Sequence, residues 1–223
     1  MTAATKRRPR TNRERVEEST LALIASAIEL FARQGYERTT AAEIGINAGF
    51  SRNMVRDRYG SKEALLQSVF EMFGQQLLPA VRGERTGTGL DHVLGQLDDL
   101  LHAVEEEPET MRAMIVLTFE TPGPLQNFAG WFDRLIAGYE AELAGHLAAG
   151  QADGSVRPDI DAAREAEIFV SYTIGLCFRS ALRRDSYDFA GEIRAFRSRI
   201  TEQYARRPRR RGRERKKSGE ALS

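Results

Sequence analysis

The sequence has a single cysteine, Cys177, in 223 residues. A chain with one cysteine forms neither an internal disulfide nor a thiolate metal site, and this fits a reducing compartment. No apolar run approaches the ~20 residues that a membrane span needs. The basic N-terminus also lacks the apolar stretch of a signal peptide. We therefore expect a cytoplasmic protein with no membrane segment.

Histidine is almost as scarce, with three residues in the chain, His92, His102 and His146. His92 and His102 are ten positions apart, which is not the spacing of metal ligands on one helix face. No phosphate-binding glycine loop and no nucleophile motif accompanies them. The sequence therefore predicts no enzyme, no metal site and no cofactor, and a helical enzyme is a disfavoured alternative.

The net charge of +1 conceals two cationic ends. Residues 1–15 carry six basic residues and one acid, and residues 206–217 carry nine basic residues and one acid. Residues 71–205 have a net charge of −10. Cationic tails favour a polyanion such as DNA, although they can also serve only to keep a chain soluble. A nonspecific, nucleoid-type DNA-binding protein therefore stays open as an alternative to a sequence-specific one.

Apolar residues make up 41% of the chain, enough for a buried core. From Val16 to Arg33 they recur at spacings of three and four, which predicts one helical stripe; its members are Leu21, Ile24, Ala27, Ile28 and Phe31. Gly35 supplies a stop. No alternating pattern predicts a strand. Further helices are expected over residues 65–81, 90–106, 109–119, 125–149, 162–184 and 189–204.

The segment from Thr39 to Leu66 predicts a helix-turn-helix. Thr40 and Glu43 have capping-box spacing at the start of a helix over 41–48, and Gly49 allows the turn. We expect Ser51 to cap the second helix, 52–59, and Ser61 to cap a helix that starts at Lys62. Ile44, Ala48, Val55 and Tyr59 would face the core, which leaves four residues outward: Arg52, Asn53, Arg56 and Asp57. Arginine and asparagine at such positions can read guanine and adenine edges.

Residues 17–70, about a quarter of the chain, resemble the DNA-binding region of the TetR (tetracycline repressor) family. The resemblance lies in the run from Ala22 to Phe70, with Phe31, Gly35-Tyr36, Thr39-Thr40, Ala48-Gly49, Ser51 and "SKEALL" at 61–66. It implies an all-α fold with an N-terminal three-helix DNA-binding domain and a larger helical ligand-binding and dimerisation domain. The implied division is a basic disordered arm, 1–15, a helix-turn-helix domain, 16–62, a ligand-binding and dimerisation domain, 63–205, and a basic disordered tail, 206–223.

The same resemblance assigns roles in DNA binding. Thr40 and Lys62 would contact phosphates, and Ser51 would reach the DNA backbone. Base edges would meet Arg52, Asn53 and Met54. The family usually has aromatic residues at the positions of Arg56 and Arg58, so we expect charge to replace them at the phosphates and the base preference to differ.

The remaining two thirds of the chain would receive a small effector and form a homodimer. Adaptable sulfur-containing and aromatic side chains suit an apolar pocket; the candidates are Met111, Met114, Phe119, Trp131, Phe132, Tyr139, Phe169 and Tyr172. Stripes on the last two helices predict the dimer interface: Ile168, Tyr172, Gly175, Leu176, Arg179, Ile193, Phe196 and Ile200. We expect a repressor that an apolar or amphipathic molecule releases from a palindromic operator, with the helix from Lys62 as the lever.

Overall fold

The computed structural model describes residues 11–77, 86–183 and 186–206. Its elements are α1 (Asn12–Gln34), α2 (Ala41–Asn47), α3 (Met54–Tyr59), α4 (Lys62–Met72), the π-helical turn η1 (Phe73–Leu77), α6 (Gly89–Glu106), α7 (Pro108–Glu120), the 3₁₀ turn η2 (Gln126–Phe128), α8 (Ala129–Asp153), α9 (Ala162–Arg183) and α10 (Phe189–Tyr204). Over these residues the fold is all-α, as expected, with one isolated β-bridge between Val156 and Ala205. Most of the two basic tails, and the expected end of the 65–81 helix, lie outside the described residues.

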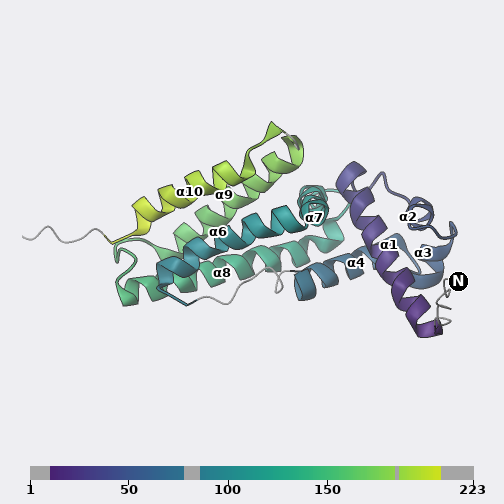
Figure 1. Cartoon of the computed structure of the whole chain (residues 1–223), viewed down its shortest axis with the longest axis horizontal. Coiled ribbons are helices and arrows are strands. Elements are labelled where there is room, and N and C mark those ends of the chain that lie inside the picture. The colour runs from purple at the N-terminus through teal and green to yellow at the C-terminus, as the bar shows by residue number, and fades with distance from the viewer. Residues whose placement is uncertain (1–10, 78–85, 184–185, 207–223) are drawn as a thin grey trace, which may run out of the picture.

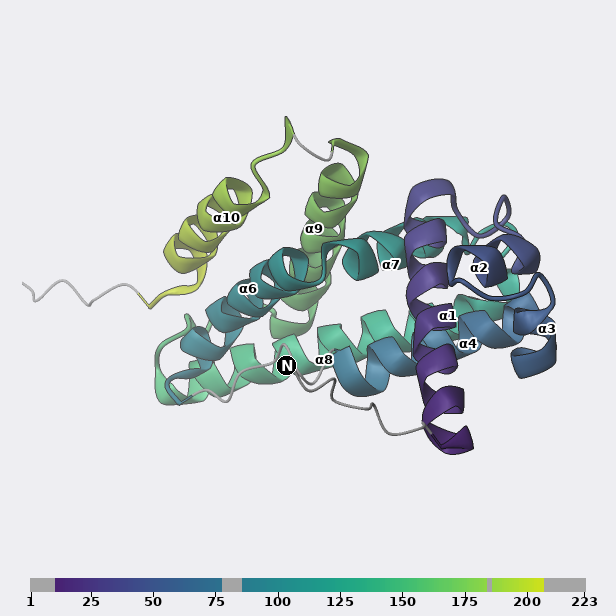
Figure 2. The ribbon, with the colours of Figure 1, turned by 45° about the vertical axis from the view of Figure 1, so that its right-hand side comes forward.

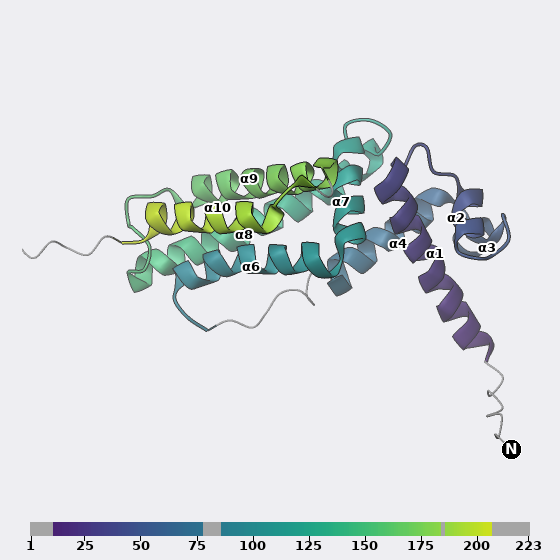
Figure 3. The ribbon, with the colours of Figure 1, turned by 45° about the horizontal axis from the view of Figure 1, so that its top comes forward.

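The helices form an elongated molecule with two ends (Figure 1). α1, α2 and α3 make up one end, and α6, α8, α9 and α10 pack side by side at the other (Figure 3). α4 and α7 lie between them, and each view places α7 beside α1 (Figure 2). Within the described ranges, no helix is both long and apolar enough to span a bilayer.

The first helix begins earlier than the apolar pattern predicts, at Asn12. A capping box starts it: Glu14 N donates to Thr11 Oγ1 over 3.2 Å, and Thr11 N donates to Glu14 Oε2 over 2.7 Å. Residues 12–15 are therefore helical rather than part of a disordered arm. Leu21 was wrongly placed in the buried stripe, because its side chain is 62% exposed.

The helix-turn-helix forms with one local difference from the prediction. The Thr40–Glu43 capping box starts α2, and Ser61 Oγ accepts from Ala64 N at the start of α4, as expected. α3, however, begins only at Met54, after a turn in which Met54 N donates to the Ser51 carbonyl. Ser51 is therefore not a side-chain cap of the recognition helix, and that prediction was wrong.

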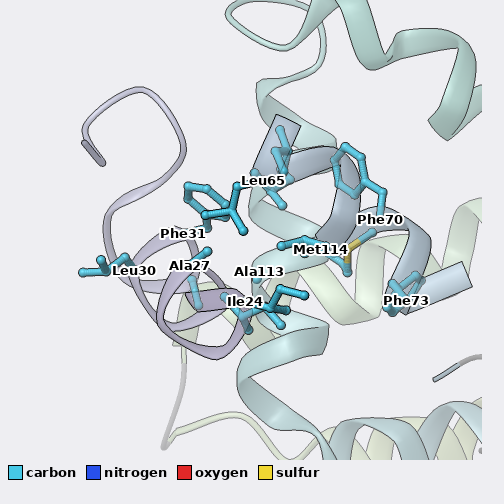
Figure 4. Close-up of a cluster of buried hydrophobic side chains, with 14 of the residues drawn as sticks. Ile24, Ala27, Leu30, Phe31, Leu65, Phe70, Phe73, Ala113 and Met114 are labelled. Carbon is cyan, nitrogen blue, oxygen red and sulfur yellow. The ribbon is translucent and has the colours of Figure 1, made fainter. Parts of the chain in front are cut away.

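One apolar core joins the DNA-binding end to the middle of the molecule. Phe31 of α1, Leu65 and Phe70 of α4 and Met114 of α7 are all at most 4% exposed and belong to this core (Figure 4). The Phe70 ring also stacks on Trp131 of α8, with centroids 4.5 Å apart. The expected boundary at residue 62 therefore does not divide the packing, because α7 and the start of α8 share the core of α1–α4.

A second core holds the far end together. Leu97 of α6, Leu143 and Leu147 of α8, Leu176 of α9 and Phe196 of α10 are at most 3% exposed in it. Full burial of a leucine or phenylalanine side chain is worth about 1.5–3 kcal/mol. Buried side chains from four helices thus stabilise the packing of this end of the molecule.

Candidate DNA-binding surface and ligand cavity

The recognition helix α3 and the turn that leads into it present polar residues to solvent. Val55 is fully buried and anchors the helix, whereas Arg52, Asn53 and Arg56 are exposed. Asn53 occupies the N-cap position, but its side chain makes no capping hydrogen bond. These three side chains are therefore directed as the sequence predicted, and their amide and guanidinium groups have the geometry that reads base edges.

Two residues assigned to DNA contact are engaged within the protein. Arg58 Nη2 donates to Ser19 Oγ over 2.8 Å, which ties α3 to α1. Met54 is partly buried and packs against the first core. Their main contribution is therefore to fix the orientation of α3, and the arrangement of Met54 does not support its predicted contact with base edges.

The start of α2 is exposed but carries an acidic partner. Glu43 Oε2 accepts from both Thr40 N and Thr40 Oγ1, each over 2.7 Å. These hydrogen bonds, first of all the one from the Thr40 hydroxyl, lower the pKa of Glu43. The Thr40 hydroxyl hydrogen is thus donated within the capping box, and a phosphate contact by Thr40 stays a prediction.

Lys62 has a role that the sequence reasoning missed. Its Nζ donates to the carbonyl oxygens of Tyr36 and Thr39 over 2.8 and 2.7 Å, and lies 3.8 Å from the Tyr36 ring centroid. Desolvation by burial lowers the pKa of this ammonium, although nearby carboxylates oppose the shift. The ammonium therefore points into the α1–α2 connection instead of standing free for a phosphate, and it fixes the position of α2.

Polar contacts also connect α7 to the DNA-binding end. Glu120 Oε2 accepts from Tyr36 N over 2.8 Å, and Arg112 Nε donates to the Ala32 carbonyl at the end of α1 over 2.8 Å. A Cβ on Gly35 would lie 2.1 Å from Glu120 Oε1, so only a glycine allows the carboxylate to come this close. Glycine also tolerates the positive φ of 81° at this position. No spacing in the sequence indicates this contact, because its partners are 80 or more positions apart.

A cavity of about 180 Å³ lies within the helical body and is mainly apolar. Five of the eight expected pocket residues line it: Met111, Met114, Phe132, Tyr139 and Phe169. The remaining lining includes Phe73 at the end of α4, so the helix proposed as the lever does reach this cavity.

Three expected pocket residues lie elsewhere. Phe119 is 53% exposed and packs on Phe178, with ring centroids 4.5 Å apart. Trp131 stacks on Phe70 in the first core, and Tyr172 packs on Phe196, with centroids 4.2 Å apart. Residue type alone does not separate side chains that line a cavity from those that fill a core, and this accounts for all three errors.

The polar lining was missed from the sequence. Gln96 and Asp99 of α6 and Glu142 of α8 all line the cavity. Gln96, Asp99 and Ala103 are spaced to share one helix face, so polar residues on a buried face were the available signal. Cys177 also lines the cavity, and burial raises the pKa of its thiol to about 12, which keeps the sulfur protonated and unreactive.

The predicted dimer interface needs correction, because half of its residues are buried within their own protomer. Leu176, Ile193, Phe196 and Ile200 are 2–3% exposed and belong to the second core. The outward face of α9 is instead a stripe spaced by three and four residues. We call it the α9 stripe; its members are Ile168, Ser171, Gly175, Phe178 and Leu182. Leu182 is 68% exposed, and a Cβ on Gly175 would meet no atom within 4 Å.

Comparison with known families and folds agrees with this arrangement. The model of the family described as "Bacterial regulatory proteins, tetR family" matches residues 23–69, which span the helix-turn-helix. A comparison with curated protein sequences found no match.

Solved structures of similar fold cover most of the chain. One is the fatty acid degradation regulator FadR from Bacillus halodurans, with a TM-score of 0.70 at 13% identity over 87% of this chain and 97% of that one. Another is a TetR transcriptional regulator from Chloroflexus aurantiacus, with a TM-score of 0.69 at 18% identity over 86% and 98%. A third is NalD, the secondary repressor of a multidrug efflux pump in Pseudomonas aeruginosa, with a TM-score of 0.68 at 16% identity over 85% and 98%. At these identities the likeness shows a shared fold.

Proposed function

Because the chain belongs to the TetR family of bacterial regulatory proteins, we propose that it is a homodimeric repressor that a small molecule releases from a palindromic operator. It would act in the cytoplasm, where its DNA is found, and would perform no catalysis. The observation that carries the proposal is the position of α7. This helix forms one wall of the cavity and also makes one hydrogen bond to the end of α1 and one to the turn that follows α1.

Recognition of the operator sequence would depend on exposed side chains of α3 and of the turn that leads into it. Arg56 is exposed on α3, which Val55 anchors in the core, and Arg52 and Asn53 are exposed in the turn that leads into it. A short helix held in this way fits the major groove, where a bidentate contact is worth about 1–3 kcal/mol of discrimination against the wrong base.

Dimerisation supplies a second recognition helix, which the second half-site of a palindromic operator requires. A repressor with two recognition helices needs them about one DNA turn apart, ~34–36 Å, or a multiple of it. The α9 stripe is the apolar, outward-facing surface suited to a second copy, because Phe178 and Leu182 are exposed there and Gly175 leaves room for close approach. Phe119 of α7 packs on Phe178, so the cavity helix also borders this surface.

Release of DNA would follow from a shift of α7 and α4 when the cavity is filled. Met111 and Met114 of α7 and Phe73 beyond α4 line the cavity. Arg112 and Glu120 of the same α7 hold α1, so displacement of α7 moves the DNA-binding end. A coupling of about 1–3 kcal/mol between the two sites is typical of allosteric proteins.

Binding-site selection with the purified full-length protein tests the DNA-binding part. We expect a palindromic motif with a defined footprint, and Arg52→Ala and Asn53→Ala to weaken binding by ~1–3 kcal/mol each and relax particular positions. Asp133→Asn, an exposed change on α8, is the control and keeps the wild-type motif. A selection that returns no motif, with affinity that depends only on salt, would establish the nonspecific nucleoid-type alternative instead.

A further inference from the structure

A second pocket, of about 250 Å³, lies beside the apolar cavity; we call it the side pocket. Met111 and Ile115 of α7 and Cys177 of α9 line both spaces, so the cavity and the side pocket share a wall. Methionine is unbranched and flexible, and its side chain adapts readily to what packs against it. A ligand that fills the cavity can therefore extend past Met111 into the side pocket.

The side pocket contains a cationic side chain, Arg112 of α7, which is half-buried. Arg112 Nε donates to the Ala32 carbonyl over 2.8 Å, and this uses one of the five N–H groups of the guanidinium. Among the described residues, no carboxylate forms an ion pair with Arg112, and no group accepts a hydrogen bond from its two Nη atoms. The side pocket thus has a positive charge and four N–H donors that the described protein does not pair.

A hydroxyl group from a second helix lines the same pocket. Ser180 of α9 is partly buried there, and its hydroxyl makes no hydrogen bond to another described residue. The acid among the described lining residues is Glu109, which is exposed at the start of α7 and forms no ion pair with Arg112. Arg112 and Ser180 therefore bring hydrogen-bond donors from α7 and α9 to one polar pocket beside an apolar cavity.

A second copy of the chain on the α9 stripe would leave the side pocket accessible. Helix positions turn by 100° per residue, so Ser180 lies about 140° around α9 from Gly175 of the stripe. Cys177 and Ala181, the other α9 residues of the side pocket, lie on the same side of the helix as Ser180. The side pocket and the proposed dimer interface are therefore on different faces of α9.

We propose that the effector is an amphipathic carboxylic acid, whose apolar body fills the cavity and whose carboxylate pairs with Arg112 in the side pocket. The inference rests on the proposed function, because it names the ligand class of the same cavity. The planar guanidinium matches a carboxylate in a bidentate pair, and such charge-assisted hydrogen bonds are the strong ones. An ammonium head group would instead meet a like charge.

The same contact acts on the connection between α7 and α1. The Ala32 carbonyl at the end of α1 is a neutral acceptor, and a carboxylate competes for the guanidinium as a charged one. When the guanidinium turns to the ligand, α7 loses one of its two hydrogen bonds to the DNA-binding end. Recognition of the head group is thereby coupled to release of DNA, in addition to the effect of filling the cavity.

Three probes with one apolar body and different head groups test the proposal: 4-phenylbutyrate, 4-phenylbutanol and 4-phenylbutylamine. Affinities for the full-length, DNA-free protein are measured by calorimetry at neutral pH. We expect the butyrate to bind about tenfold or more tightly than the alcohol, as hydrogen bonds between charged groups predict, and the amine to bind most weakly.

The variant Arg112→Met keeps the aliphatic stem and removes the guanidinium. It is expected to lose the preference for the butyrate and to retain the affinity for the alcohol. Arg112→Lys keeps the charge without the bidentate geometry, so it should show an intermediate preference. The matched control is Arg194→Met, which removes the same charge from an exposed position on α10 and keeps the wild-type order of affinities. If Arg112→Met fails to fold, Arg112→Lys must by itself lower the preference for the butyrate.

Three results would overturn the proposal: an alcohol or amine that binds as tightly as the butyrate, a preference for the butyrate that survives in both Arg112 variants, or no binding of the butyrate. A loss of affinity for butyrate and alcohol by the same factor in Arg112→Met would also overturn it, because Arg112 would then act only through its contact with Ala32. Since these measurements use protein without DNA, a failure of the ligand class is distinguishable from a failure of the operator experiment.

Discussion

Replacing Lys62 by methionine separates a structural role from a DNA contact. The change keeps the aliphatic stem but removes the ammonium that donates to the Tyr36 and Thr39 carbonyls over 2.8 and 2.7 Å. Hydrogen bonds from a charged donor are worth about 1.5–3 kcal/mol each when buried. This ammonium is only about half-buried, so we discount the pair for solvent screening to ~2 kcal/mol in total.

A loss of that size is measurable by thermal unfolding followed by circular dichroism. For a chain of 150–250 residues each kcal/mol shifts Tm by ~2–4 °C, so Lys62→Met is expected to melt ~4–8 °C below wild type. The control is Arg52→Met, which removes one positive charge from an exposed position near the recognition helix. It is expected to leave Tm within about 1 °C of wild type, because exposed substitutions rarely change stability.

DNA binding provides the second half of this test. A direct phosphate contact would lower the slope of log affinity against log salt by about 1 when it is removed. We expect no such decrease for Lys62→Met measured well below its melting temperature. If Lys62→Met melts like wild type and loses one unit of salt slope, Lys62 is a phosphate contact and its assignment to the α1–α2 connection is refuted.

Three further changes test local features. Gly45→Ala places a Cβ 2.5 Å from the Ser51 carbonyl oxygen, so the helix-turn-helix must shift, and stability should fall by about 1–3 kcal/mol in urea unfolding. Gly145→Ala, where a Cβ meets nothing within 4 Å, should instead add up to about 1 kcal/mol; equal effects would contradict the packing at Gly45. Glu43→Gln tests a carboxylate whose folded pKa lies below its ordinary value of 4.5. Its stabilising contribution is present above 4.5 and is lost as the pH falls through the folded pKa, so the Tm difference from wild type should be seen at pH 7 and vanish at acidic pH below the folded pKa; a difference independent of pH would exclude this role. Leu182→Glu in the α9 stripe should give a folded monomer by light scattering and circular dichroism, since the side chain is 68% exposed in the protomer; an unchanged dimer would place the interface elsewhere.

The sequence predicted the helices well because their ends carry local signals. Thr40 with Glu43, Ser61 and Gly35 mark boundaries that depend only on nearby residues, and the structure has all of them. The start of α1 was missed because the apolar stripe begins only after the helix does, although Thr11 and Glu14 already had capping-box spacing.

The site was predicted less completely, for reasons of geometry. Neighbouring helix positions differ by 100°, so a stripe through Leu176 and one through Gly175 look alike in sequence, yet the first faces the core and the second faces solvent. The hydrogen bond from Tyr36 N to Glu120 joins positions 84 apart and has no local signal. Lys62 shows the same limit, because a charged residue at a helix start is compatible with a phosphate contact and with an internal one.

Reciprocal linkage between ligand and operator tests whether a small molecule in the cavity releases the protein from DNA. A ligand found by thermal-shift screening is titrated into free protein and into protein saturated with the selected operator, and operator affinity is measured with and without that ligand by fluorescence anisotropy. We predict that ligand and operator weaken each other by the same factor, about 5- to 150-fold for a coupling of 1–3 kcal/mol. Equal ligand affinity for free and operator-bound protein, for every ligand that binds the cavity, would contradict it.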